Sequence, residues 1–250
     1  MIMKTKTNNG KHALGNEKGN VFFFILLGVV LFAGLSYMIA KGMSSQTSNM
    51  LTERQIELAV SEILGYAQNI EESVNKLRRQ NVSEEDICFA YAQLSALNNA
   101  SYNSVSTCGD DSYKLFHPSG GGLAYRSTPD DWLDSTHISD QGYGEWMFTN
   151  KTSVIGLGSN PLNSVSTLEL TAHLNHLKET VCTAINRKLG ISGIPDNSNA
   201  FAPVSPVNSG FTSAGGQINV AALSGKRAGC FRNTAVWNSY IFYKVLIERD

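Results

Sequence analysis

The sequence predicts an α+β protein in which an N-terminal transmembrane helix continues into a long amphipathic helix and then into a globular head. Residues 21–40 form an uncharged apolar run, residues 46–79 carry one apolar stripe, and the rest alternates strand-like segments with one further helix-like segment. The 250 residues, 42% of them hydrophobic, suffice for one globular domain plus an appendage. We therefore expect a head with a small antiparallel sheet and a second helix.

The apolar run predicts the transmembrane helix. Residues 21–40 read VFFFILLGVVLFAGLSYMIA, and a helix of that length spans about 30 Å, the hydrocarbon thickness of a bilayer. Residues 1–19 hold four Lys and one Glu, a charge of +3, which leaves −4 for residues 20–250 out of the net −1. Positive charge before the helix predicts a cytoplasmic leader (1–19), a membrane span (20–40) and a periplasmic or extracellular remainder.

A cleaved secretory signal is the alternative interpretation of the same run. Such signals carry an apolar region of roughly 7–15 residues that ends in a small-x-small cleavage site. Here the run is longer, and Met38-Ile39-Ala40 matches that site poorly. The sequence therefore favours a retained span in contact with membrane lipid.

Residues 41–80 are predicted to form an amphipathic helix. Apolar side chains alternate at spacings of four and three, which places them on one face of a helix: Ile56, Val60, Ile63, Ala67, Ile70, Val74 and Leu77. Charged residues stay off this face. The helix is expected to pack on its own domain or to form a coiled-coil stalk.

Residues 81–250 are predicted to form the globular head. Short apolar segments bounded by turn residues predict strands, at 123–125, 145–148, 151–157, 218–223 and 236–246. The second and third of these flank a predicted turn at Asn150. A Leu-rich stripe predicts a helix at 166–189 that ends at Gly190, and residues 191–217 are expected to be an irregular loop.

Four cysteines lie in the head and none in the leader or the apolar run. An even number of cysteines outside the cytoplasm predicts two disulfides, and three pairings are possible. We favour Cys88–Cys108, which closes a short loop, and Cys182–Cys230, which ties the late helix to the final strands. Four free buried thiols are the alternative, and the absence of C-x-x-C argues against zinc.

Catalytic and ligand-binding motifs are absent from the sequence. No nucleophile elbow, phosphate loop or H-E-x-x-H motif occurs, and the balanced charge does not indicate nucleic-acid binding. Glu169, His173 and His176 would share a face of the predicted late helix, but a solvated helix surface explains them more simply than a metal does. We therefore expect no enzyme, cofactor or metal.

A short basic leader ends in Lys18-Gly19, and Asn20 then opens the apolar run. This boundary resembles the leader of type IV prepilins and of type II secretion pseudopilins. The resemblance implies that a prepilin peptidase cuts after Gly19, so that the mature chain begins at Asn20. Phe24 stands where most of the family carry Glu, as in the atypical minor pseudopilin of the filament tip.

The resemblance implies a structural subunit. The apolar helix would first hold the protein in the membrane and then pack among the helices of protein partners in a filament. A minor or tip component fits Phe24 better than a major subunit does. The alternative is a bitopic membrane protein whose outer domain binds a protein or ligand partner.

Overall fold

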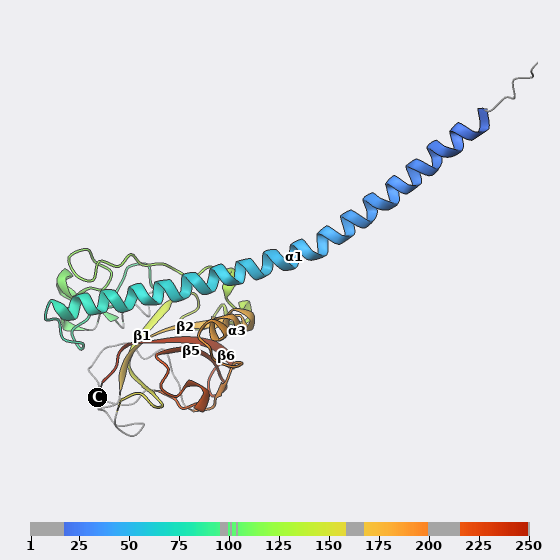
Figure 1. Ribbon diagram of the computed structural model, residues 1–250. Helices are drawn as coiled ribbons and strands as arrows, with labels where there is room; N and C mark the ends of the chain where they lie inside the picture. The colour runs from blue at the N-terminus through green and yellow to red at the C-terminus, as the bar shows by residue number, and fades with distance from the viewer. Residues whose placement is uncertain are drawn as a thin grey trace, which may run out of the picture. The chain divides into compact units, whose positions relative to one another are not determined.

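The computed structural model (Figure 1) describes residues 18–95, 100, 102, 103, 105–158, 168–199 and 216–249, with side chains described at 22–37 but not at 18–21 or 38–51. The chain divides into two compact units, Met1–Glu53 and Arg54–Asp250. We describe each unit by itself. The second unit corresponds closely to the head together with the stripe-bearing helix.

The long helix α1 runs from Lys18 to Arg79. The prediction that residues 20–40 form a transmembrane helix is wrong: among the residues that the structure describes, no helix is long and apolar enough to cross a membrane. The predicted single-pass localisation depended on that span and is corrected with it.

The stripe predicted on the second part of α1 is confirmed. Six of its side chains are at most 4% exposed, and Ile56 packs against them. Within the Arg54–Asp250 unit they form one wall of the larger hydrophobic core. A charged cluster adds to this contact, because Glu71 pairs with Lys244 at 2.7 Å and with Arg227 at 3.1 Å.

The head contains one sheet of six strands in the order β3-β5-β6-β2-β1-β4. The strands β5, β6, β2 and β1 are antiparallel neighbours, whereas β3 and β4 add to the two edges in parallel. Their bounds are β1 Trp146–Val154, β2 Glu169–Leu177, β3 Asp196–Asn197, β4 Gly216–Ile218, β5 Ala228–Asn233 and β6 Ser239–Ile247. The predicted small antiparallel sheet is therefore corrected to a larger mixed one.

The predicted helix at 166–189 is also wrong over most of its length. Its first half is the strand β2, at the centre of the sheet and fully buried, and only Glu179–Lys188 form a helix, α3. Gly190 does follow the helix end with a positive φ of 70°, as expected for a C-terminal cap. The two segments predicted around Asn150 are one strand, β1, with a register shift between Thr149 and Thr152.

The sheet has two buried faces. Alternate β2 side chains, Leu170, Ala172 and Leu174, belong to the core that α3 and the second part of α1 share, and Figure 1 shows α3 and this part of α1 against the sheet. The opposite face carries a smaller cluster that includes Ile218, Phe231, Ile241, Tyr243 and Val245. Because both faces are covered, β2 is buried at all nine positions.

Between α1 and β1 the described chain has turns and short 3-10 helices in place of the predicted strand at 123–125. These helices are η1 Ser106–Gly109, η2 Asp111–Tyr113, η3 Asp130–Trp132 and η4 Ser135–His137, and η6 Ala221–Leu223 follows β4. Two isolated bridges attach this region to the end of β2, Leu133 to Leu177 and Tyr143 to Asn175. The segment 133–143 is thereby held beside that strand end.

Candidate functional site

The N-terminal unit presents an apolar helical surface, which we define as residues 22–37 of α1. Its large apolar side chains are exposed, from 46% at Leu27 to 74% at Phe32, and none of the sixteen residues is charged. Apart from the neighbouring residues and backbone of α1 itself, a Cβ on Gly28 or Gly34 would meet no described atom within 4 Å. A contiguous exposed apolar surface of this kind marks an interaction site.

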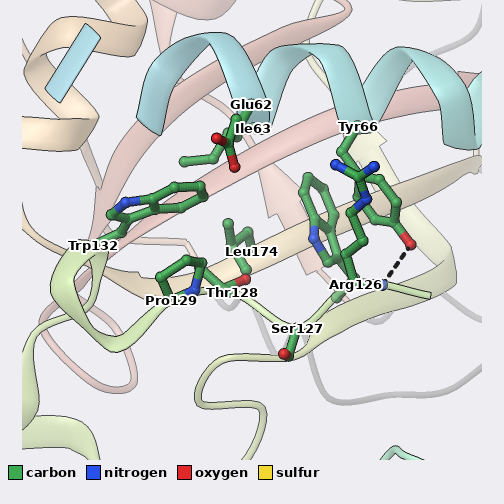
Figure 2. Close-up of a pocket in the computed structure, with 10 residues that line it drawn as sticks. Glu62, Ile63, Tyr66, Arg126, Ser127, Thr128, Pro129, Trp132 and Leu174 are labelled. Atoms are coloured by element: carbon green, nitrogen blue, oxygen red, sulfur yellow. Dashed lines mark hydrogen bonds between the residues drawn. The ribbon is translucent and has the colours of Figure 1, made fainter. Parts of the chain in front are cut away.

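A small cavity lies in the second unit, between α1 and the segment 126–132 (Figure 2). Its volume is about 80 Å³, and Tyr66, Arg126, Trp132 and Leu174 are among its lining residues. The hydroxyl of Tyr66 donates to the carbonyl of Ala124 at 3.0 Å and accepts the backbone N–H of Arg126 at 3.1 Å. Burial raises the pKa of Tyr66 to about 12, so the hydroxyl keeps its proton.

This cavity is too small for a ligand site. Small-molecule pockets usually have volumes of roughly 300–1,000 Å³. The two hydrogen bonds of Tyr66 instead fix the segment 124–126 on α1. We therefore assign the cavity to the packing of this segment.

The structure contains both favoured disulfides. Cys88 is bonded to Cys108, and Cys182 on α3 is bonded to Cys230 on β5, with Cα atoms 5.2 and 5.5 Å apart. The first bond closes the segment between the end of α1 and η1. The second attaches α3 to the sheet, so both have structural roles.

The predicted processing residues, Gly19 and Asn20, lie in the first turn of α1. For these two residues the structure describes the helical backbone alone. Cleavage after Gly19 therefore stays a prediction.

The three residues considered for a metal on a helix face lie on the strand β2. Glu169 and His173 are buried there, and the hydroxyl of Thr171 is 2.6 Å from Nε2 of His173. Burial lowers the pKa of His173 to about 3 and raises that of Glu169 to about 8. Both groups are therefore held mainly in neutral form, which indicates a structural role in the interior.

His176 does not join Glu169 and His173. It stacks on His137, with ring centroids 4.8 Å apart, and Asp140 lies beside the pair. Burial, and to a smaller extent the charge of His137, lowers the pKa of His176 to about 4. Sequence analysis did not single out His137 and Asp140. Their spacing of three residues, a histidine followed by a carboxylate, was the pattern that could have indicated a pair of potential metal ligands.

Comparisons with protein-family models, with curated proteins and with solved structures found no match to this chain. Three features therefore carry the functional argument. They are the exposed apolar helical surface, the disulfide-bonded head, and the cluster around His176.

Proposed function

We propose that this protein is a pilin- or pseudopilin-like structural subunit that assembles through its apolar helical surface. The observation that carries the proposal is the exposure of uncharged, large apolar side chains along residues 22–37. Removing apolar area from water is worth roughly 25 cal/mol per Å². Helices of neighbouring subunits would bury this surface along its whole length.

The rest of the molecule supports the same proposal. The second part of α1 already buries its stripe in the head, with Ile70, Val74 and Leu77 fully covered. The two disulfides cross-link that head, which forms a compact unit. The second part of α1 therefore packs into a folded head, while residues 22–37 of the same helix remain exposed and apolar. A filament subunit requires both features.

Site-specific photo-crosslinking in cells that produce the protein tests this assembly. We expect Phe32→p-benzoylphenylalanine to yield adducts of discrete mass, in which mass spectrometry places the partner peptide in an N-terminal apolar helix. That partner is another copy of this chain or a different pilin-like subunit. The same replacement at Val236, which is 50% exposed on the head, should yield no such adduct.

A matched pair of leucines on α1 provides the control. Leu35 is 63% exposed inside the apolar helical surface, and Leu58 is 61% exposed outside it. Leu35→Glu should abolish the Phe32 adducts because it places a charge in the helix contact, whereas Leu58→Glu should leave them intact. Equal effects of the two variants, or partner peptides from outside a helix of this kind, would overturn the proposal.

Processing of the leader is tested separately. We expect the mature protein to begin at Asn20, and Gly19→Val to retain residues 1–19. The intact mass and N-terminal sequence of the protein from its native source measure this. An uncut wild-type chain would contradict the prediction of prepilin-type processing. The crosslinking experiment would still test the proposed assembly through the helix.

A further inference from the structure

Two segments that are distant in the sequence bring three metal-binding side chains together. His137 ends η4 and Asp140 follows three residues later, whereas His176 lies near the end of β2. The backbone N–H of Asp134 donates to the carbonyl of His176 at 2.8 Å. Together with the bridges from Leu133 and Tyr143 to the end of β2, this bond fixes the two segments side by side.

The three side chains have their ligand atoms close to one another. Nδ1 of His137 is 2.7 Å from Oδ2 of Asp140, and one potential ligand atom from each residue lies within 4.8 Å of the other two. Ligands bound at ~2.0–2.1 Å in a tetrahedron are roughly 3.3 Å apart. Small side-chain rotations would therefore bring all three atoms to one ion.

The surroundings hold one ligand firmly and leave the others accessible. His176 is fully buried, and the ring of Trp237 lies 5.0 Å from its own. The side chains of His137 and Asp140 are 16% and 36% exposed. An ion could therefore arrive from solvent on the side of His137 and Asp140 and meet an imidazole already fixed by packing.

We propose that His137, Asp140 and His176 form a Zn²⁺ site, with water as the fourth ligand. Two imidazoles and one carboxylate are donors that suit a borderline-soft divalent ion better than Mg²⁺ or Ca²⁺. Binding replaces the hydrogen bond between His137 and Asp140 with two bonds to the metal. The ion then ties the segment 133–143 to the end of β2 and stabilises the folded head.

Cobalt titration of the untagged full chain, freed of metal by a chelator, tests the site. We expect one Co²⁺ per chain, with the intense visible absorption of tetrahedral Co²⁺, and stoichiometric displacement by Zn²⁺. His137→Gln and Asp140→Asn should each lower the affinity at least about tenfold, because each removes a ligand. These side chains reach the surface, and thermal unfolding of the metal-free variants verifies that they fold.

His117 provides the matched control. Its Nε2 lies 3.4 Å from Oδ2 of Asp111, so it forms a second histidine–carboxylate pair, and no third ligand is grouped with it among the residues that the structure describes. His117→Gln should leave the Co²⁺ spectrum and affinity unchanged. The absence of a tetrahedral spectrum, or equal losses in His117→Gln and His137→Gln, would overturn the site.

Discussion

At the scale of single residues, Glu169 is a carboxyl group in an interior that favours its neutral form. Its Oε2 accepts the backbone N–H of Val154 at 3.1 Å, but burial dominates and raises its pKa from 4.5 to about 8. Between these two pH values the unfolded chain has lost the proton and the folded chain still holds it. Stability therefore falls as pH rises from about 4.5 to 8 and is highest below this window.

Replacing this carboxyl group should remove that pH dependence. Glu169→Gln keeps an acceptor for the Val154 N–H and cannot ionise, so we expect little change in the free energy of unfolding at pH 5. At pH 8 we expect stabilisation of up to roughly 4 kcal/mol, since each pKa unit is worth ~1.4 kcal/mol. Urea unfolding at both pH values measures it, with exposed Glu57→Gln as the control. A larger gain at pH 5 than at pH 8 would contradict this explanation.

The buried hydroxyl of Tyr102 makes two hydrogen bonds to the backbone of one β1 residue. Its hydroxyl accepts the N–H of Phe148 at 2.7 Å and donates to the carbonyl of Phe148 at 3.2 Å. Tyr102→Phe leaves both backbone groups without this partner, so we expect a loss of about 1–3 kcal/mol in unfolding free energy. Half-buried Tyr113→Phe should change it by no more than ~0.5 kcal/mol, and comparable losses in both would argue against the assignment.

At the scale of secondary-structure elements, the stripe on α1 is the contact that joins this helix to the sheet. Ile70 is fully buried there, while its neighbour Asn69 is exposed. Ile70→Ala should cost about 2–5 kcal/mol through lost burial and a residual cavity. Asn69→Ala should cost less than ~0.5 kcal/mol. Thermal and urea unfolding of the two variants compare them. Equal losses of stability would contradict the packing explanation, because Ala raises the helix propensity at both positions.

The strand β2 explains why its segment resembles a helix in the sequence. Leu170 and Leu174 are four residues apart, a spacing that serves one face of a helix and also one face of a strand. Leu177 would belong to the other face of a regular strand, but the register shifts between Leu174 and Leu177. The spacing alone does not distinguish a helix from a strand. Pairing with β1 and β6 makes this segment a strand.

The strand β1 shows a second effect of irregular pairing. Asn150 favours turns, yet it is fully buried within β1, beside the register shift between Thr149 and Thr152. A bulge admits a residue that regular pairing would not favour. The sequence therefore predicted two strands where the structure has one.

At the scale of the whole molecule, the two disulfides constrain loops of different length. Their sequence separations are 20 residues for Cys88–Cys108 and 48 for Cys182–Cys230. Loop-closure entropy predicts stabilisation of roughly 3 and 4 kcal/mol respectively. Each bond thus cross-links two segments that are distant in the chain.

The loss of stability on removing each disulfide should follow the same order as the loop lengths. We expect the double variant Cys182→Ala/Cys230→Ala to lose more unfolding free energy than Cys88→Ala/Cys108→Ala, by about 1 kcal/mol. Urea unfolding under non-reducing conditions measures the two, and the wild type under reducing conditions should approach the sum of their losses. The reverse order would show that native-state packing outweighs loop entropy.

The sequence by itself determined the features that depend on local pattern. The stripe from Val60 to Leu77 and the cap at Gly190 follow from residue spacing and residue type. The sequence left three disulfide pairings possible, and the structure contains the one that we favoured. The predicted membrane span also came from a local pattern, an apolar run, and the described helix did not support it. Its exposed side chains instead became the basis for the proposed assembly surface.

Only the tertiary structure decided the sheet and the cluster around His176. Strand order and register arise from contacts between distant segments, and burial on both faces removes the alternation that identifies a strand in a sequence. His137 and Asp140 meet His176 across more than thirty residues because the segment 133–143 is bonded to the end of β2. A group of potential ligands of this kind is defined by distances in space. The spacing of residues along the chain does not show these distances.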